Sequence, residues 1–592
     1  MRVAVHVTHE AVQKIGGIGS VINGVCTADN YKNFFEKTLL YGPAFTSISD
    51  VFSKLGRGGN VLYSNQDSLD KDAYHSIFYP IIEKYQIDII YGTRTLASEY
   101  NINKTNEVEV LLVNVQNMKQ SHVDIFKYVL WEKYGIQSDR FTDWDYEQYV
   151  RIAVCYFDLL NALYGQSFSF YHFSHEYMGI PSCLKIISES FNLGLKNHKT
   201  IFWAHEISPA RSVVENYPGH DISFYNILNE AEKRYISMES IYPEILDNYR
   251  TQLVKRTINF DFIFAVSNLV KKEYLFLNPQ IEKEKIKIVY NGISFQNIDW
   301  KKKSDSREKL LKYIESIFNF KFNVLFTHVT RLVSSKGLWR DFNLLEKLDE
   351  IFYENGLKGA YILLSTLIGT GRNTSDIYRM EKEYGWPVLH KKGWPDCIGY
   401  EEEIYDYVQI FNAKSKAIKA LFINQFGFDT RTCGNRVPIE TNIADLRIAS
   451  DAELGYSIYE PFGISQIETI PYGGVSLLSR ACGSSFLFDS ILKNNCPKAY
   501  HIIDFSSIEN LKIPKINEII KSTESIDLMK NLNFELRKDI ENELFNINLK
   551  EIYDVIPKTD KDRKVLLESI LLYINNFSWE SRLKDIFNYF EN

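Results

Sequence analysis

Short apolar runs of strand length recur along the chain and alternate with segments of helical periodicity. In the first half they lie at 2–8, 87–92, 110–115, 168–173, 200–205, 262–267 and 286–292, and in the second half at 322–329, 360–366, 420–425, 454–460, 474–479 and 500–504. Runs that are apolar on both faces and alternate with helices are typical of buried parallel sheets. The pattern predicts an α/β chain with two such sheets.

Two charged or amphipathic segments predict where the domains begin and end. The segment 299–308, DWKKKSDSRE, lacks apolar periodicity and is predicted to be a linker. It separates an N-terminal domain over 1–300 from a C-terminal domain over 306–570. The closing segment 571–592 contains an amphipathic helix whose apolar side must dock on the protein. That side carries Trp579, Leu583, Ile586, Phe587 and Phe590.

Composition narrows the class of protein. The 592 residues include 45% hydrophobic and 24% charged residues, which is ordinary globular usage. The net charge of −7 is spread over both signs without a basic block, so nucleic acid is not expected as a partner. Seven cysteines without Cys-x-x-Cys spacing predict reduced thiols and no metal site. Because the chain has neither the apolar core of a signal peptide nor a membrane span, we expect it in the cytoplasm.

The first candidate for chemistry is the glycine-rich stretch KIGGIGS, which follows the first predicted strand. Open parallel sheets bind ligands at the carboxyl ends of their strands. There the amides of Gly16 and Gly17 could approach a diphosphate, and Lys14 would supply a mobile cation. The alternative is a bare turn, which this stretch on its own favours.

A second candidate lies at the end of the strand that opens the second domain. Arg331 and Lys336 stand five residues apart, next to Gly337 at a predicted helix start. Two cations at the carboxyl end of a strand suit a leaving group that bears phosphate. The alternative for this pair is a solvated loop.

The third candidate, YEPFGISQIETIPYGG, is the most specific. Glu460 and Glu468 are eight residues apart, so a helix between them would place Glu468 about two turns in. The amides at its start would be free donors aimed at an anion, with one carboxylate beside them for sugar hydroxyls and the other for ribose. Those amides belong to Gly463, Ile464 and Ser465.

Together the three motifs resemble retaining glycosyltransferases of the GT-B fold, in particular glycogen and starch synthases. The resemblance covers most of the chain apart from about 46–145, 375–440 and 505–570. HEAVQKIGGIGSVI, with Glu10 four residues before its lysine, is similar to the start of animal and fungal glycogen synthases. HFSHEYMGIPSCL resembles their His-Glu-Trp-x-x-Gly motif, with Tyr177 in place of Trp, and FWAHEISPARSV keeps His205 and Arg211 six apart. The five-residue spacing from Arg331 to Lys336 is closer to bacterial glycogen and plant starch synthases.

The resemblance implies two Rossmann-like domains facing a cleft, with the last helix crossing back onto the N-terminal domain and anchored by Trp579. It implies that nucleotide phosphates meet one set of residues from each domain, that a histidine lies by the transferred sugar, and that no cofactor is needed. The implied catalytic residues are Glu460, His175, Arg331 and Lys336, and the implied substrate-binding residues are Lys14, Gly16, Gly17, Glu10, His205, Arg211, Gly463, Ile464, Ser465 and Glu468.

The leading hypothesis is therefore an enzyme that transfers glucose from UDP-glucose or ADP-glucose to an α-1,4-glucan. The nucleobase stays open, because Thr441-Asn442-Ile443 stands where the family has a stacking tyrosine. Activation by a hexose phosphate is not expected, because 506–571 holds only Arg537 and Arg563 where the animal and fungal family has an arginine-rich helix.

Other hypotheses remain open beside it. A related transferase could act on a small sugar, a lipid or a protein, and a catalytically inactive protein of the same fold could bind sugars. A phosphorylase would need a lysine that holds pyridoxal phosphate, and no such site is identified. A homo-oligomer is also left open.

Overall fold

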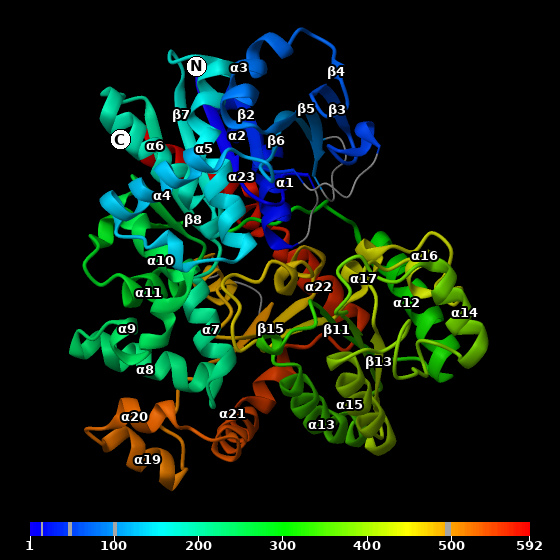
Figure 1. Cartoon of the computed structure of the whole chain (residues 1–592). Coiled ribbons are helices and arrows are strands. Elements are labelled where there is room, and N and C mark those ends of the chain that lie inside the picture. The colour runs from blue at the N-terminus through cyan, green and yellow to red at the C-terminus, as the bar shows by residue number, and fades with distance from the viewer. Residues whose placement is uncertain (13–15, 45–49, 99–103, 492–498, 592) are drawn as a thin grey trace. The chain divides into compact units, whose positions relative to one another are not determined.

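A computed structural model describes residues 1–12, 16–44, 50–98, 104–491 and 499–591. The chain forms two compact units (Figure 1). Unit 1 comprises Met1–Arg211, Ala231–Ser294 and Trp579–Asn592, and unit 2 comprises Ser212–Glu230 and Phe295–Ser578. Each unit is built on one sheet with helices packed against it, so the predicted α/β chain with two sheets is confirmed.

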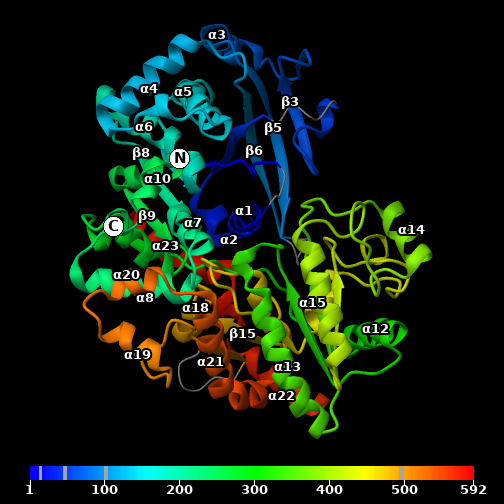
Figure 2. The ribbon, with the colours of Figure 1, turned by 60° about the horizontal axis from the view of Figure 1, so that its bottom comes forward.

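The sheet of unit 1 has ten strands in the order β10-β9-β8-β7-β1-β2-β6-β5-β3-β4. The strands from β10 to β6 are parallel, whereas β5, β3 and β4 continue the sheet in antiparallel pairs (Figure 2). This antiparallel part comes from the region 46–145, where the sequence pattern was weakest. The strands are β1 (Arg2–Val7), β2 (Lys37–Pro43), β3 (Gly59–Ser64), β4 (Leu69–Asp70), β5 (Asp88–Ala97), β6 (Thr105–Asn114), β7 (Ser169–His175), β8 (His198–Ala204), β9 (Phe262–Ala265) and β10 (Ile286–Ile288).

Helices connect the parallel strands of unit 1. The longest, α5, is buried on nearly all sides and packs against α3, α4 and α6. The helices are α1 (Gly17–Thr27), α2 (Asp29–Phe34), α3 (His75–Tyr85), α4 (Gln120–Tyr134), α5 (Trp144–Tyr164), α6 (Ile180–Leu193), α9 (Met238–Ile241), α10 (Tyr249–Arg256), α11 (Asn268–Leu277) and α23 (Trp579–Glu591). The unit boundaries fall within two further helices, α7 (Ser208–Asn216) and α8 (His220–Arg234).

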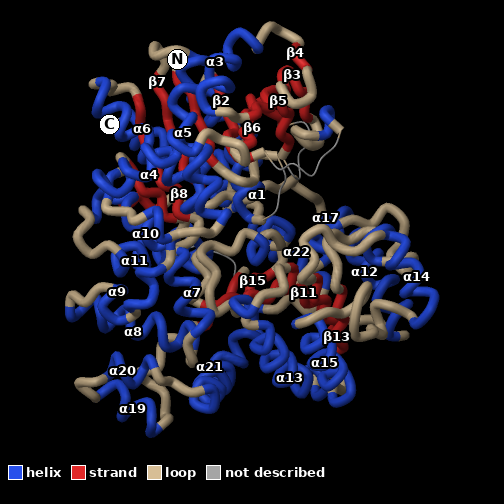
Figure 3. Tube along the Cα trace, in the orientation of Figure 1, coloured by secondary structure: helices blue, strands red, loops and turns tan. Residues whose placement is uncertain are grey.

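The sheet of unit 2 has six parallel strands in the order β13-β12-β11-β14-β15-β16. They are β11 (Val324–Val329), β12 (Gly359–Leu364), β13 (Ile418–Ile423), β14 (Ala452–Gly455), β15 (Val475–Ser479) and β16 (Tyr500–Ile503). Every residue of β12 and β15 is buried, as expected for strands covered on both faces (Figure 3).

The helices of unit 2 cover this sheet. Helices α13 and α15 pack on β13, and α21 packs on β16. The helices are α12 (Trp300–Phe318), α13 (Leu338–Glu354), α14 (Thr374–Tyr384), α15 (Tyr400–Lys414), α16 (Thr430–Cys433), α17 (Ile443–Ala449), α18 (Ser484–Ile491), α19 (Pro514–Lys521), α20 (Ser525–Lys530), α21 (Phe534–Val555) and α22 (Asp560–Ile570).

Side chains close the exposed edge of unit 2's sheet. Along the edge strand β13, the Asn412 amide both accepts from the N–H of Ala420 and donates to its carbonyl, each at 2.8 Å. The ring of His390 lies 3.0 Å from the Phe422 carbonyl. Because an unpaired strand edge is a template for association with other chains, these side chains protect it.

The predicted linker at 299–308 is instead the beginning of α12. Asp299 caps the helix by accepting from the Lys302 N–H at 2.8 Å. Lys303 is fully buried and donates to the carbonyls of Ile448 and Tyr472 at 3.0 and 2.6 Å. The linker prediction was wrong because charged residues occupy buried positions of α12, where apolar residues were expected. The cations of this helix are instead paired with residues far away in the sequence.

The last helix, α23, belongs to unit 1, and Trp579 anchors it there as predicted. Trp579 is 5% exposed and packs against Gly24 of α1. Phe587 stacks on Phe34 with ring centroids 4.6 Å apart, and Phe590 lies 4.7 Å from Tyr171. The amphipathic stripe read from the sequence is therefore the face that docks.

The cysteines are thiols throughout the described part of the chain. Six of them are buried and unbridged, and the seventh, Cys496, lies outside the described residues. Within the same part of the chain, no helix combines the length and the apolar character needed to span a membrane.

Gly24→Ala tests the docking of α23. A Cβ at position 24 would lie 2.0 Å from Nε1 of Trp579, so the ring must move. We expect a loss of about 1–3 kcal/mol of stability, as for other overpacked sites, and faster proteolytic release of the last helix. The matched control is Gly369→Ala, whose Cβ would meet open space. A Gly24→Ala protein that melts and is cleaved like the wild type would contradict this packing.

Lys303→Met tests the buried lysine of α12. Burial lowers the pKa of Lys303 from 10.5 to about 7. Between these two values the unfolded chain holds a proton that the folded chain lacks. The free energy of unfolding therefore rises with pH there, by up to ~1.4 kcal/mol per unit. This gain in the free energy of unfolding is complete above pH 10.5 and is lost as the pH falls through about 7.

The measurement is the thermal midpoint of the wild type and the variant from pH 7 to 9. We expect the difference, wild type minus Lys303→Met, to grow with pH. Lys301→Met, which removes an exposed lysine of the same helix, serves as the control and should give parallel curves. Parallel curves for Lys303→Met as well would contradict the buried, largely neutral amine.

Candidate functional site

The candidate residues gather at the carboxyl ends of parallel strands, in one set on each unit. On unit 1 they follow β1, β7 and β8, which are neighbours in the sheet. On unit 2 they follow β11 and β14, which also pair directly. Ligands of open parallel sheets bind at this edge, so the fold places both sets where binding is expected.

In unit 1, the glycine-rich stretch forms the start of α1. Glu10 is buried, and its carboxylate accepts from the N–H groups of Gly16 at 3.0 Å and Gly19 at 2.8 Å. Glu10 therefore shapes the loop, a role that the sequence did not predict. A Cβ on Gly17 would meet no atom within 4 Å, so space beside the loop is open. Lys14 lies outside the described residues.

A chain of three histidine rings lies beside this loop. Nδ1 of His6 is 2.8 Å from Nε2 of His175, and Nδ1 of His175 is 2.8 Å from Nε2 of His205. At the inner end, Nε2 of His6 is 2.9 Å from the Tyr31 hydroxyl. His175 is 1% exposed, so both of its ring nitrogens are engaged by other histidines and neither faces a ligand.

The three imidazoles are neutral at neutral pH. Burial lowers the pKa of His6 and of His205 to about 3. Burial, together with the neighbouring histidines, holds the pKa of His175 well below its usual value. Trp203 packs against both His175 and His205, at centroid distances of 5.5 and 5.9 Å, with its plane nearly parallel to both rings. The chain is thus a rigid, uncharged row of hydrogen-bonding groups.

An acidic pair flanks the outer end of the histidine chain. Glu176 has a left-handed φ of +59°, which side-chain-bearing residues rarely adopt, and it accepts from the Glu206 N–H at 2.6 Å. Burial and the nearby Glu206 raise the pKa of Glu176 well above its usual value. Arg211 binds the Glu206 carboxylate, with Nε at 2.8 Å. Arg211 therefore neutralises an acid at this edge and is not a bare cation.

In unit 2, Lys336 and Glu460 are in direct contact. The Lys336 ammonium donates to the Glu460 carboxylate, and both side chains are largely buried. The main chain fixes them: the Ser335 carbonyl accepts from Ile458 at 2.9 Å and from Tyr459 at 3.2 Å. Arg331, two residues beyond β11, is exposed and makes no ion pair with any described residue.

The Glu-Pro-Phe-Gly turn presents a row of free amides. Gly463 has φ +87°, and a Cβ there would lie 2.6 Å from Sγ of Cys482, so only glycine fits. The N–H groups of Gly463, Ile464 and Ser465 donate to no acceptor in the described part of the chain. The predicted α-helix is absent, because Ser465–Ile467 is a 3-10 turn and Glu468 ends it. The donors therefore form a loop that can surround an anion, without a helix dipole behind them.

Glu468 has a partner that the sequence did not predict. Arg447 is 1% exposed and bridges two carboxylates, at 2.9 Å to Glu453 and 2.7 Å to Glu468. A buried guanidinium with planar donors holds a carboxylate in one orientation. Arg447 lies in α17, 21 residues before Glu468, and no local motif links the two.

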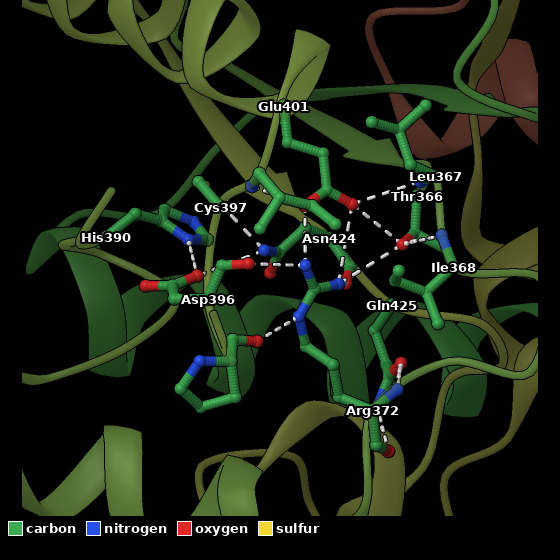
Figure 4. A network of polar contacts seen from close by, with 12 residues as sticks. Thr366, Leu367, Ile368, Arg372, His390, Asp396, Cys397, Glu401, Asn424 and Gln425 are labelled. Atoms are coloured by element: carbon green, nitrogen blue, oxygen red, sulfur yellow. Dashed lines mark hydrogen bonds and ion pairs between the residues drawn. The ribbon is translucent and has the colours of Figure 1, made fainter. Parts of the chain in front are cut away.

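The loops after β12 and β13 are joined by a buried polar network (Figure 4). Arg372 pairs with Glu401 at 2.5 Å, and Glu401 also accepts from Thr366 at 2.8 Å. Two apolar side chains at these strand ends stay exposed, Leu367 at 42% and Phe426 at 58%. Both follow strands of the same sheet edge as Arg331, and the sequence pattern did not single them out.

His390, Asp396 and Cys397, also drawn in Figure 4, lie close enough to share a metal ion. The hydrogen-bond network already uses this cluster. His390 meets Asp396 at 2.8 Å and the Phe422 carbonyl at 3.0 Å, while Asp396 also accepts from Asn424 at 3.0 Å. We therefore assign these residues to the support of the loops. Asn442, in the segment considered for the nucleobase, caps α17.

Comparisons with known proteins give structural matches only. A scan against protein-family models and a search of curated proteins find no match. Among solved structures, an α,α-trehalose-phosphate synthase (UDP-forming) from Burkholderia xenovorans in complex with glucose-6-phosphate matches at 11% identity and a TM-score of 0.48, covering 100% of both chains.

Two further matches are similar. A synthase of the same description from Burkholderia vietnamiensis has 12% identity and a TM-score of 0.49, with coverage of 99% of this chain and 98% of that one. The catalytic domain of starch synthase IV from Arabidopsis thaliana, bound to ADP and acarbose, has 13% identity and a TM-score of 0.47, with coverage of 96% and 99%. Because these sequence identities and TM-scores are low, the functional conclusion rests on the chemistry of the site itself.

Proposed function

We propose that the protein is a retaining glycosyltransferase that transfers glucose from a nucleoside-diphosphate glucose to the non-reducing end of an α-1,4-glucan. The observation that carries the proposal is the arrangement in unit 2. The Lys336–Glu460 pair joins the loops that follow the paired strands β11 and β14, at the carboxyl edge of a parallel sheet, and the loop of Glu460 also holds three amides with no acceptor among the described residues. A cation and unpaired N–H donors suit a departing diphosphate, and a carboxylate beside them suits sugar hydroxyls.

The chemistry favours electrostatic stabilisation over a covalent intermediate. Glu460 is ion-paired with Lys336, which lowers its value as a nucleophile. A front-face reaction, in which the leaving phosphate accepts the proton of the acceptor, needs only positioned donors and cations. Arg331 and the amides of 463–465 supply these in unit 2.

The nucleobase has a candidate surface in unit 2. Phe426 follows β13, and Arg331 follows β11, two strands away in the sheet. Strand spacing places the two strand ends about 10 Å apart, which a ribose and a base can span. An exposed aromatic ring at that place suits a base by stacking. Glu468, held by Arg447, is the proposed ribose contact.

The same site would also serve a transferase with another acceptor, and a non-catalytic protein on this fold would bind the donor without turnover. A hexose-phosphate-sensing helix stays disfavoured. Arg563 is committed to Asp451 at 2.6 Å, and Arg537 is buried against the ring of Trp339.

A donor panel tests the proposal. UDP-glucose, ADP-glucose and the corresponding galactose donors are incubated with the protein, and released nucleoside diphosphate is measured with glycogen, with glucose, with glucose 6-phosphate and without acceptor. Label from one glucose donor entering glycogen with retained anomeric configuration supports the proposal. Release only with a small sugar keeps the transferase and contradicts the glucan acceptor. Donor binding by calorimetry without release contradicts the transferase.

Lys336→Ala tests the phosphate contact. We expect turnover to fall roughly 10²–10³-fold, about 3–4 kcal/mol, since one donor to the developing charge is lost. Arg331→Ala and Glu460→Gln should be similarly damaging. The control is Lys309→Ala, which removes a partly exposed lysine from another carboxylate pair of unit 2. Near-normal turnover of Lys336→Ala, with an unchanged thermal midpoint, would remove the assignment.

Phe426→Ala tests the base contact. Stacking on an aromatic ring is worth about 1–3 kcal/mol per base, so we expect KM for the nucleotide sugar to rise about tenfold or more, with kcat little changed. Phe534→Ala is the matched control, because that ring is 59% exposed against 58% for Phe426 and begins α21. Equal KM values for the two variants would place the base elsewhere.

A further inference from the structure

The histidine chain of unit 1 has an inner end and an outer end with different properties. At the inner end, the Tyr31 hydroxyl is 2.9 Å from Nε2 of His6 and 3.0 Å from Oγ1 of Thr38. Tyr31 is 1% exposed. At the outer end, His205 is half-buried, and its Nδ1 bonds to no described residue. Only this last nitrogen of the chain is left for a ligand.

A neutral imidazole donates through one nitrogen and accepts through the other. Since both nitrogens of His6 and His175 take part in the chain, the proton positions of all three rings are linked. Only two arrangements satisfy every bond. In the outward one, Tyr31 donates to His6, each ring donates to the next, and His205 presents an Nδ1–H. In the inward one, every proton moves to the opposite nitrogen, and Nδ1 of His205 is a bare acceptor.

The neighbours of Tyr31 decide between the two arrangements. A phenol is a better donor than an aliphatic hydroxyl, and an imidazole nitrogen is a better acceptor than a hydroxyl oxygen. Tyr31 therefore donates to His6, and the Thr38 hydroxyl donates to Tyr31. The Cys26 thiol, a weak donor, also contacts the Tyr31 hydroxyl. In the inward arrangement, the Tyr31 hydroxyl would instead have to donate to the Thr38 hydroxyl.

We propose that Tyr31 is a positioning residue that sets the tautomer of His205 through His6 and His175, so that Nδ1–H of His205 is a donor at the carboxyl edge of unit 1. The low pKa values of these histidines keep the chain uncharged. Stacking of Phe173 on His6, at 4.7 Å and 9°, and of Trp203 on the other two rings prevents the imidazoles from rotating out of line.

This assignment deepens the proposed function and, for its ligand, rests on it. His205, and not His175, is the ring that meets an oxygen of the sugar or phosphate. His175 acts through its neighbour. Because the donor is neutral, it holds an oxygen without adding a charge.

A second row of hydrogen-bonded histidine rings in unit 1 provides a matched control. The Tyr156 hydroxyl is 2.7 Å from Nδ1 of His172, whose Nε2 is 2.9 Å from Nδ1 of His198. His172 and His175 are three residues apart on β7 and so face opposite sides of the sheet. His198 begins β8, so this chain leads to the amino end of the strands, away from the candidate site.

The first experiment reads the tautomers directly. The full chain is labelled with ¹⁵N-histidine, and the nitrogens of its twelve histidines are recorded by long-range ¹H–¹⁵N correlation at neutral pH, with His205→Gln for assignment. We expect His205 as the Nδ1–H tautomer in the wild type. Tyr31→Phe removes the donor at the inner end, so His205 should shift to the other tautomer or to a mixture. Tyr156→Phe should leave His205 unchanged.

Thr38→Val distinguishes the two directions and also serves if Tyr31→Phe does not fold. In the outward arrangement Tyr31 needs no acceptor at Thr38, so the tautomers stay as in the wild type. In the inward arrangement the loss of that acceptor changes them. An Nε2–H tautomer of His205 in the wild type, or a Thr38→Val spectrum with His205 shifted, overturns the proposal. So does a folded Tyr31→Phe protein with an unchanged His205.

The second experiment is kinetic and uses the donor that the panel identifies. We expect Tyr31→Phe to lower kcat/KM about tenfold, the effect of one misdirected hydrogen bond, while Tyr156→Phe stays at the wild-type value. Equal values for the two variants, when the tautomer of His205 has shifted, would contradict a ligand contact by His205. If no donor is turned over, the proposed function fails, and the tautomer measurement still decides the assignment of Tyr31.

Discussion

Parallel strands cannot be joined by tight turns, and this constraint places the candidate residues of the protein. Each parallel strand must be followed by a loop and a crossover, so the loops after successive strands collect at one edge of the sheet. His205 follows β8, Arg331 follows β11, and Phe426 follows β13 in this way. The chemistry of both units is thus built from short segments far apart in sequence, held in register by strands that are themselves largely buried.

Buried arginines paired with carboxylates hold those segments in place. Arg340, fully buried on α13, binds Asp221 at 2.7 Å and Glu541 at 2.8 Å, and so attaches α8 and α21 to the same helix. Arg372 and Arg447 likewise form ion pairs, with Glu401 and Glu468, that fix the loops after β12 and β14. Removing one partner of such a pair leaves a charge without solvation, at a cost of about 3–5 kcal/mol, so these contacts fix geometry strongly.

The binding edges of the two units carry different groups. Unit 2 has the exposed cation Arg331, the Lys336–Glu460 ion pair, and the amides of Gly463, Ile464 and Ser465, which have no acceptor among the described residues. Unit 1 presents neutral groups: a row of uncharged imidazoles, a carboxyl whose pKa is raised, and an arginine paired with Glu206. Neutral hydrogen-bonding groups favour hydroxyl oxygens, whereas an exposed cation with free amides favours phosphate.

The sequence by itself determined the α/β class, most strands and the docking helix with Trp579. These features follow from the local periodicity of apolar residues and from single residues whose steric requirements can be recognised in the sequence. Tertiary structure alone decided the rest. Because buried cations interrupt its apolar pattern, α12 was predicted as a linker, and the antiparallel strands β3 and β4 of unit 1 carry too little apolar pattern to be predicted. The pairing of Arg447 with Glu468 and the order from Tyr31 to His205 are contacts across the fold. No spacing records them, because hydrogen bonds and ion pairs depend on distance in space.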